Sequence, residues 1–286
     1  MKNINSFLNW SESQLTQAGV LSPRLDSEVL LAHALKLSRS QLLIHSKKTL
    51  NEAEKKCAEI NVRRRRKREP VSLITGYQEF WSLDFLVDEN VLIPRPETEL
   101  LIETGLNCIS PASKNILDLG TGSGVLALVM AKEASACKVT ALEIDPKALK
   151  IAKQNAKNHG MRDRIKFLCK DLRKEDWGGP YSMILSNPPY ISSTDIDKLM
   201  PEVKNYEPRK ALDGGLTGIE FYKSIIPIAI NQLEEKGFLI LEIGHNQVNE
   251  VTALLRQFSA YQKIEVIKDY SGYNRVVKAQ KESRYG

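Results

Sequence analysis

Apolar residues are spaced in two different ways along the chain, and each spacing predicts a different kind of structure. Up to about residue 70, apolar positions recur every three or four residues, which is the spacing of an amphipathic helix. Thr49 with Glu52, or Asn51 with Glu54, forms a capping box that predicts the start of one such helix. Because no strand-like run interrupts residues 1–70, we expect a small helical bundle there.

A short segment rich in turn-forming residues follows the predicted helices. Gly76 predicts a break in regular structure, and the apolar positions within residues 80–87 predict a β-hairpin. Pro94 and Pro96 then hold the backbone extended and end regular structure. We therefore expect residues 71–95 to form a linker built around a hairpin.

From about residue 96 onward, short apolar runs alternate with amphipathic helical stretches. Such runs are typical of strands in a parallel sheet that helices cover on both faces. Near the end of the chain, two runs flank a turn rich in Gly and Asn and predict a closing antiparallel hairpin. Residues 96–286 are thus expected to form an α/β domain, a mostly parallel sheet with strands near 115–119, 138–144, 165–168, 183–186, 238–243, 263–268 and 275–278.

The composition is that of an ordinary globular protein. Of the 286 residues, 42% are hydrophobic and 27% are charged, and the net charge is +6. No apolar run is long enough to span a membrane, and the first residues lack the pattern of a secretory signal, so we expect a cytoplasmic protein without a membrane partner. The basic run Arg63–Arg68 is interpreted as a solvated helix end, with a contact to a macromolecular partner as the alternative.

Cysteine and histidine residues give no sign of metal or redox chemistry. The four cysteines are scattered and form no C-x-x-C pair, so they are interpreted as reduced thiols, mostly buried. The four histidines show no metal-ligand spacing. We therefore expect no metal site.

A glycine-rich turn follows the first predicted strand and precedes a helix that starts at Val125. Such a turn lets a ligand approach the backbone, at the edge of a parallel sheet where ligands bind. The carboxylate of Asp118 would repel pyrophosphate but suits the ammonium of an amino acid, which favours S-adenosylmethionine over a dinucleotide. Val125 also replaces the third glycine of the dinucleotide-binding pattern. The predicted cofactor-binding turn comprises Asp118, Gly120, Thr121, Gly122, Ser123 and Gly124.

Two acids further along the chain are candidates for binding the same cofactor. Glu143 ends the next predicted strand, where an acid accepts hydrogen bonds from the two ribose hydroxyls of a nucleoside. Asp171 follows the third strand, where its carboxylate could accept a hydrogen bond from the adenine amino group beside the backbone of Leu172. The alternatives are a solvated Glu143 next to a plain tight turn, and a surface Asp171 that caps a turn.

The segment Asn187-Pro188-Pro189-Tyr190 follows the fourth predicted strand. Its two prolines fix the backbone, so the Pro188 carbonyl is expected to be held in one direction. The side-chain oxygen of Asn187 is a second acceptor, and together the two oxygens can bind both hydrogens of an NH2 group. Tyr190 could pack on a planar amide and lie near a cationic sulfonium. A rigid turn that merely ends a strand is the alternative.

Together with the glycine-rich turn, this segment resembles the class I S-adenosylmethionine-dependent methyltransferases that act on a planar NH2 group. The resemblance implies a Rossmann-like, mostly parallel seven-stranded sheet. Further segments narrow it to the release factor glutamine N5-methyltransferase (PrmC/HemK) family, and it covers nearly the whole chain. These segments are Arg24-Leu25-Asp26, Glu79-Phe80-Trp81, Ile93 to Glu99, Glu207-Pro208-Arg209, Ala211 to Gly215 and Leu241 to Gly244.

This resemblance implies a substrate and a set of site residues. The implied reaction methylates the glutamine side chain of the Gly-Gly-Gln motif in class 1 peptide chain release factors. Residues 1–70 are then expected to recognise this substrate, and the alternative for Arg63–Arg68 becomes a contact with release factor or RNA. Asn187 is expected to line the cofactor as well as the substrate. The implied substrate-binding residues are Asn187, Pro188, Pro189, Tyr190, Arg95 and Glu97, and of these Asn187, Pro188 and Tyr190 are expected to be catalytic.

Three other functions are weighed against this one. An N6-adenine nucleic-acid methyltransferase shares the chemistry, but it would need a basic and aromatic surface and a pocket for a flipped base. The helical domain has one basic run and few aromatic residues, so no stable nucleic-acid complex is expected. A glutamine methyltransferase of a ribosomal protein is the second rival, and a non-catalytic module that binds release factor or ribosome is the third.

Overall fold

The computed structural model describes residues 3–174 and 176–283. By its internal contacts the chain divides into two compact units, each of which is described by itself. The helical unit comprises the residues up to Tyr77 together with Leu199–Tyr206, and the sheet unit comprises Gln78–Lys198 and the residues from Glu207 onward. Whether 1–70, 71–95 and 96–286 fold as separate domains stays a prediction.

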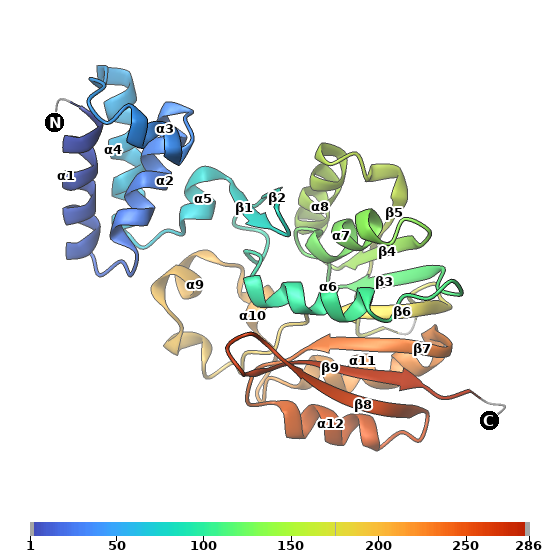
Figure 1. Cartoon of the computed structure of the whole chain (residues 1–286). Helices are drawn as coiled ribbons and strands as arrows, with labels where there is room; N and C mark the ends of the chain where they lie inside the picture. Colours follow the sequence, from blue (N-terminus) through green and yellow to red (C-terminus); the bar gives the residue numbers. More distant parts are fainter. Residues whose placement is uncertain (1–2, 175, 284–286) are drawn as a thin grey trace. The chain divides into compact units, whose positions relative to one another are not determined.

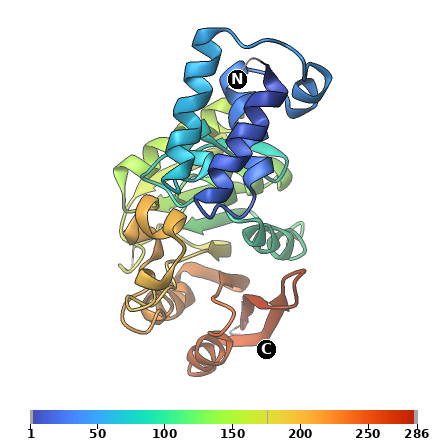
Figure 2. The same ribbon diagram turned by 90° about the vertical axis from the view of Figure 1, so that its left-hand side faces the viewer.

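The helical unit is a bundle around a small apolar core, as predicted. Figures 1 and 2 show α1, α2 and α4 side by side. Asn51, not Thr49, caps α4: its side chain accepts the backbone N–H of Glu54, whose carboxylate accepts that of Asn51. The helices of the unit are α1 (Ile4–Gln17), α2 (Pro23–Leu35), α3 (Arg39–Ile44), α4 (Glu52–Arg66), α5 (Val71–Thr75) and α9 (Pro201–Tyr206).

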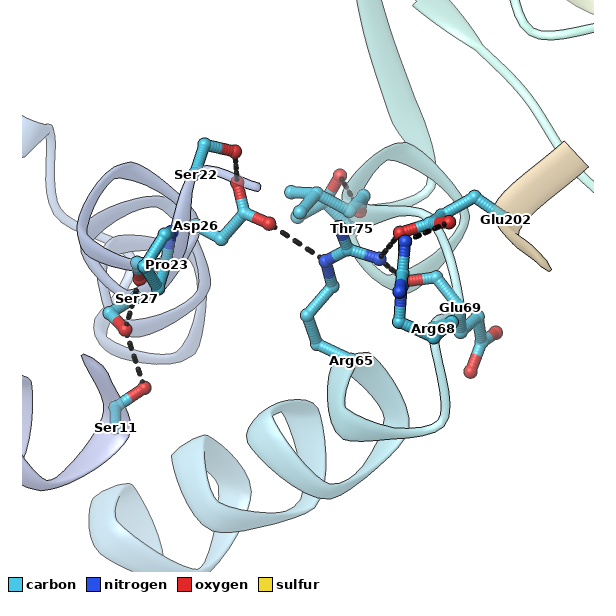
Figure 3. Close-up of polar contacts among 11 residues, drawn as sticks. Ser11, Ser22, Pro23, Asp26, Ser27, Arg65, Arg68, Glu69, Thr75 and Glu202 are labelled. Atoms are coloured by element: carbon cyan, nitrogen blue, oxygen red, sulfur yellow. Dashed lines mark hydrogen bonds and ion pairs between the residues drawn. The ribbon is translucent and has the colours of Figure 1, made fainter. Parts of the chain in front are cut away.

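A buried ion-pair network lies at the end of α4 (Figure 3). Arg65 is only 7% exposed; its Nε donates to Asp26 Oδ2 at 2.7 Å and its Nη1 lies 3.1 Å from Glu202 Oε1. Arg68 binds both oxygens of Glu202, at 2.6 and 2.7 Å. The interpretation of Arg63–Arg68 as a solvated helix end is therefore wrong for Arg65 and Arg68, because acids distant in sequence meet the end of this helix.

The sheet unit begins with the predicted hairpin, and irregular backbone follows it. The hairpin strands β1 (Tyr77–Phe80) and β2 (Leu83–Leu86) pair with each other. The backbone is then irregular up to the short 3₁₀ helix η1 (Pro96–Thr98), as Pro94 predicts. The prediction is wrong for Pro96, which is the first residue of η1, where proline is tolerated because no N–H is needed. The side chain of Asn155 binds the hairpin backbone, because it donates to the Leu86 carbonyl at 3.0 Å and accepts the Leu86 N–H at 2.7 Å.

The centre of the sheet unit is the predicted seven-stranded, mostly parallel sheet, with the order β5-β4-β3-β6-β7-β9-β8. The first five strands in this order are parallel, β9 is antiparallel to β7, and β8 is antiparallel to β9. Its strands are β3 (Asn115–Leu119), β4 (Lys138–Glu143), β5 (Ile165–Cys169), β6 (Tyr181–Ser186), β7 (Leu233–Glu242), β8 (Tyr261–Lys268) and β9 (Asn274–Lys281).

Helices cover both faces of this sheet (Figure 1). Neighbouring strand residues point to opposite faces, so Ile116 joins the apolar core under α6 and α7 while Leu117 joins the core under α11 and α12. The longer helices of this unit are α6 (Glu99–Leu106), α7 (Val125–Glu133), α8 (Pro146–Asn158), α11 (Glu220–Gln232) and α12 (Val248–Arg256). Shorter ones are η2 (Arg162–Arg164), η3 (Ile196–Lys198) and α10 (Arg209–Leu212).

The register of the parallel strands brings their carboxyl ends to one edge of the sheet. Leu119 is paired with Leu142 on one side and with Ser186 on the other, and Ser186 is paired with Leu241. The residues that follow these strands therefore lie next to each other, as expected for the ligand-binding edge of an α/β sheet.

The cysteines differ in part from their predicted burial. All four are free thiols, but Cys57 and Cys169 are exposed, so the expectation that they are mostly buried is wrong for these two. They lie on the solvent side of α4 and at the end of the edge strand β5, where the core does not cover them. Within residues 3–174 and 176–283, no group of His, Cys, Asp and Glu side chains could hold a metal ion. The same residues include no helix that is both long enough and apolar enough to cross a membrane.

Candidate cofactor and acceptor site

A cavity of about 810 Å³ opens at the carboxyl edge of the sheet. Its wall includes residues from the ends of three neighbouring strands, β3, β4 and β6, and from the loop after β5. Much of the predicted site therefore comes together in one place. The predicted residues that line the cavity are Gly120, Gly122, Glu143, Asp171, Leu172, Asn187 and Pro189.

The glycine-rich turn presents backbone to this cavity. Gly120 and Thr121 donate their N–H groups to the Leu142 carbonyl, at 2.8 and 3.0 Å, which ties the turn to the end of β4. A Cβ atom at Gly122 would meet nothing within 4 Å, whereas one at Gly124 would lie 3.2 Å from the backbone of Ala152 on α8. The two glycines thus serve different ends: Gly122 leaves room for a ligand, and Gly124 lets two helices pack closely.

Asp118 lies behind the turn and is fully buried. Its Oδ2 accepts the Thr121 hydroxyl at 2.5 Å and the Ala127 N–H at 3.0 Å, so it joins the turn to the start of α7. Burial raises the pKa of this carboxyl to about 7. Its Oδ1 has no hydrogen-bond partner among the described residues, a state that suits a nearby cation. Asp118, Thr121, Ser123 and Gly124 do not line the cavity itself, and their contact with a cofactor stays a prediction.

Glu143 is positioned to hold a nucleoside. Its Oε2 accepts the N–H of Gly122 and its Oε1 accepts that of Asp145, both at 3.0 Å, so the carboxylate has one orientation. Burial raises the pKa of Glu143, and the hydrogen bond from Gly122 acts in the opposite direction. Each oxygen keeps a lone pair, so the carboxylate can still accept two hydroxyl groups. The residues present therefore fit the ribose of S-adenosylmethionine.

Asp171 and Leu172 also lie in the cavity wall, with a partner that the sequence did not reveal. Nε and Nη2 of Arg173 bind the two carboxylate oxygens of Asp171, at 3.1 and 3.0 Å, and this pairing lowers the pKa of Asp171. The Leu172 carbonyl accepts the indole N–H of Trp177 at 3.1 Å. Contact of Asp171 with an adenine amino group stays a prediction, and Arg173 would share the carboxylate.

Asn187 directly follows β6 and is held by a single side-chain contact. Its Nδ2 donates to the Thr98 hydroxyl oxygen at 3.1 Å, while its Oδ1 accepts no hydrogen bond from the described part of the chain. Pro189 lines the cavity beside it, and Pro188 is buried outside the cavity wall. An acceptor oxygen of Asn187 is thus available next to the glycine-rich turn.

Tyr190 holds the loop after β6 in place through two hydrogen bonds. Its hydroxyl donates to Glu242 Oε1 at 3.3 Å, and its carbonyl accepts the side-chain N–H of Gln247 at 2.9 Å. Burial raises the pKa of this phenol well above its usual value, and the charge of Glu242 adds to the effect. Tyr190 does not line the cavity, so the predicted stacking on a substrate amide stays a prediction.

The segment that carries Arg95 and Glu97 is bound to the buried acid Glu207. Arg95 Nη2 donates to Glu207 Oε1 at 2.5 Å, and the Ile93 N–H donates to Oε2 at 3.1 Å. Glu97 is exposed to solvent. Neither Arg95 nor Glu97 lines the cavity, and their predicted substrate contacts stay predictions.

Thr98, Glu207 and Glu242 have no role in the site predicted from the sequence. Glu242 carried a usable signal, because it is a charged residue at the end of the apolar strand β7, just as Glu143 ends β4. Thr98 and Glu207 lie in segments that carry the family resemblance, but nothing in these segments indicates their contacts, which join residues far apart in the chain: 89 positions for Thr98 and Asn187, and 114 for Glu207 and Ile93.

Solved structures share the fold of the sheet unit. A methyltransferase from Pyrococcus furiosus superposes with a TM-score of 0.54 at 20% identity, covering 71% of this chain and 91% of the other. The catalytic domain of hMettl16 superposes with a TM-score of 0.60 at 19% identity, covering 74% of this chain and 80% of the other. At such identities the likeness concerns the fold alone.

Sequence comparisons agree on both units of the chain. Residues 6–76 match the family described as PrmC N-terminal domain, and residues 96–203 match the methyltransferase small domain. The release factor glutamine methyltransferase of Geobacter sulfurreducens is 38% identical over 274 residues, 96% of this chain and 95% of that relative. The one of Moorella thermoacetica is 39% identical over 263 residues, 92% of this chain and 93% of that relative. The chain belongs to the release factor glutamine methyltransferase family.

Proposed function

We propose that the chain transfers a methyl group from S-adenosylmethionine to the side-chain amide nitrogen of the glutamine in the Gly-Gly-Gln motif of class 1 peptide chain release factors. The observation that carries the proposal is the position of Asn187. Its side chain lines the same cavity as Gly122 and Glu143, and its Nδ2 is already bound to Thr98. An amide oxygen is thereby left for an acceptor beside the cofactor-binding turn.

The cofactor fits the residues of the cavity. When bound, S-adenosylmethionine supplies an electrophilic methyl group. Glu143 would accept the two ribose hydroxyls, because each of its oxygens has one backbone donor and a free lone pair. Gly120 and Gly122 would let the ligand lie against the backbone. Asp118, with one unpartnered oxygen behind the turn, would add a negative charge near the expected ammonium group when it is ionised, which its pKa of about 7 favours above neutral pH.

The acceptor nitrogen determines what the chain must contribute. An amide nitrogen is a poor nucleophile, because its lone pair is delocalised into the carbonyl. Asn187 Oδ1 would accept one of its N–H groups and aim the nitrogen at the methyl carbon. The Pro188 carbonyl stays the predicted acceptor for the other N–H group, although Pro188 itself does not line the cavity. In the transfer the nitrogen gains the methyl group, a neutral thioether is left, and one proton passes to water. The two acceptor oxygens stabilise the positive charge that develops on nitrogen before that proton leaves.

The partner and the place of action follow from this substrate. The relatives of G. sulfurreducens and M. thermoacetica are named for release factors, which supports a protein acceptor. Because release factors act on ribosomes, we expect the protein to work in the cytoplasm. The helical unit is the candidate for recognising the release factor, and we expect no stable complex with nucleic acid and no membrane partner.

The test is a transfer assay with labelled S-adenosylmethionine and three acceptors: a class 1 release factor, the same factor with its motif glutamine replaced by alanine, and duplex DNA. The proposal expects label on the unchanged factor alone. Label that persists on the alanine variant would show that the motif glutamine is not the methyl acceptor. Label on DNA would instead support the adenine methyltransferase.

A further inference from the structure

We propose that Thr98 and Glu242 form a two-residue relay that fixes which end of the Asn187 side-chain amide faces the acceptor. The inference rests on the proposed function, because it explains how the amide-binding oxygen is kept in place. Both residues are positioning residues, since neither lines the cavity. Thr98 precedes Asn187 in the chain and lies at the start of α6, whereas Glu242 follows Asn187 and ends β7.

The relay starts from the contact between Asn187 and Thr98. Thr98 is 4% exposed, and its hydroxyl oxygen accepts Asn187 Nδ2–H at 3.1 Å. A hydroxyl that accepts this bond still has its own proton to donate. The neighbour that can take this proton is Glu242: the Thr98 hydroxyl lies near enough to lower the pKa of this carboxyl, but the two side chains do not yet make a hydrogen bond of standard geometry.

Glu242 is itself in need of a donor. It is 1% exposed; its Oε1 accepts the Tyr190 hydroxyl at 3.3 Å, and its Oε2 is without a partner of standard geometry among the described residues. A buried carboxylate oxygen of this kind is costly unless a nearby donor turns toward it. The Thr98 hydroxyl is that donor, and bonding to Glu242 would settle the direction of its proton.

The direction of this proton decides the orientation of Asn187. A side-chain amide can turn by half a revolution and exchange its oxygen and nitrogen at little cost, unless its neighbours distinguish donor from acceptor. An ionised Glu242 can only accept, so Thr98 must donate to it and can only accept from Asn187. Nδ2 then faces Thr98, and Oδ1 is left for the acceptor. The reverse orientation would present an NH2 group to the substrate NH2 group and repel it.

Protonation of Glu242 would weaken this control, because a carboxyl group can also donate. Burial raises the pKa of Glu242 to about 7, while the Thr98 hydroxyl, the positive charge of Arg275 and the Tyr190 hydroxyl lower it. Glu97 adds a negative charge that raises it, and Tyr222 is the further titratable group nearby. We therefore expect turnover of the wild type to fall as the pH drops below about 7.

The experiment compares Glu242→Gln and Thr98→Val with Thr98→Ser as the matched control, because serine keeps the hydroxyl. In release-factor methylation we expect kcat to fall about ten- to a hundredfold for the first two variants, less than for loss of a direct contact. The dissociation constant for S-adenosylmethionine should stay within about threefold. Thr98→Ser should keep near-normal turnover, and Glu242→Gln should lose the fall in turnover below pH 7.

A second measurement does not depend on the substrate. In protein labelled with ¹⁵N-asparagine, the Asn187 side-chain resonances are identified by their loss in Asn187→Ala. The relay expects one pair of resonances in the wild type and in Thr98→Ser, and shifted or exchange-broadened ones in Glu242→Gln and Thr98→Val. If the wild type does not methylate release factor, the proposed function fails, and these spectra still decide on the relay. Unchanged Asn187 resonances, or near-normal kcat, in both variants would overturn it.

Discussion

Asn187 has no acid–base chemistry of its own, so its part in methyl transfer must come from position and partial charge. The side chain is anchored at one end only, through Nδ2 to Thr98 at 3.1 Å. Its other end is an amide oxygen next to a rigid pair of prolines, in the wall of the cavity. Because this oxygen is already in place, it need not move when positive charge develops on the acceptor nitrogen. Fixed polar groups of this kind contribute strongly to catalysis for that reason.

Replacing Asn187 by alanine should therefore lower kcat by about 10²–10³, as for the loss of one preorganised polar contact. Binding of S-adenosylmethionine should change much less, because the turn and Glu143 remain. Steady-state methylation of release factor gives kcat, and calorimetric titration gives the cofactor affinity. The control is Asn158→Ala, which removes an exposed asparagine at the end of α8 and should leave both quantities unchanged. Near-normal turnover of Asn187→Ala would show that this side chain does not bind the amide.

Glu143 should determine the affinity for the cofactor and have no direct contact with the acceptor. In Glu143→Gln one oxygen becomes an NH2 group, which must then face a backbone N–H of Gly122 or Asp145. We expect the dissociation constant for S-adenosylmethionine to rise about ten- to a hundredfold, the value of a hydrogen bond to a charged group. Calorimetric titration measures it, with Glu133→Gln on α7 as the control. Equal affinities of the two variants would exclude Glu143 from the nucleoside site.

Among the elements of the helical unit, α9 (Pro201–Tyr206) depends most on a polar contact. None of its residues is buried, so apolar packing contributes little to holding it. Glu202 instead binds Arg65 and Arg68 at the end of α4 (Figure 3). The free-energy cost of removing these charged groups from water is offset only while their oppositely charged partners stay in place.

Glu202→Gln should consequently destabilise the helical unit by about 3 kcal/mol, because it leaves Arg65 buried with a single anionic partner, Asp26. The local effect is measured by hydrogen exchange, which should become faster in residues 199–206 and at the end of α4. Glu59→Gln is the matched control: it removes an ion pair with Arg63, which is 70% exposed, and should cost almost nothing. Unchanged exchange at 199–206 in Glu202→Gln would mean that the segment is held by other contacts.

Helices and strands whose structure is determined by residues near each other in the chain could be predicted from the sequence. The strands β3 to β6 were visible because each contains a short apolar run, and β3 (Asn115–Leu119) has its predicted bounds. The strand β7 (Leu233–Glu242) begins earlier than the predicted run at 238, because its first half is mostly charged. Short helices were missed: α9 and α10 (Arg209–Leu212) have four to six residues, too few to show a helical period. The burial of Arg65 was missed because its partner Asp26 lies 39 residues away.

The same distinction holds for the site. The glycine-rich turn and Asn187 could be found because chemistry and spacing coincide within one short segment at a strand end. Thr98 and Glu207 could not be assigned a role, because each acts through a hydrogen bond to a distant part of the chain. The position of Glu242 at the end of β7 was a usable signal, but its bond to Tyr190, 52 positions away, was not visible. A sequence reveals which groups can react more readily than which groups hold them.

For the whole molecule, the internal acids set how stability depends on pH. Asp118 and Glu242 are both almost fully buried in the sheet unit, and burial raises the pKa of each to about 7 from ordinary values of 3.8 and 4.5. Each group therefore binds its proton more tightly in the folded chain than in the unfolded one. Their cost to folding is absent below the ordinary pKa, grows as the pH rises toward 7, and is constant at higher pH.

Stability of the cofactor-free protein should therefore fall between pH 6 and pH 8, by about 1 kcal/mol for each of the two acids. In a unit of this size the melting temperature should drop by about 5 °C in total. Asp118→Asn cannot ionise, but its amide oxygen can still accept the Ala127 N–H, so it should remove about half of the drop. Scanning calorimetry of both proteins at the two pH values measures the difference, and the comparison cancels groups that titrate alike in both. Equal drops in wild type and variant would mean that Asp118 is already ionised at pH 6, and that a cation or water reaches its Oδ1 in solution.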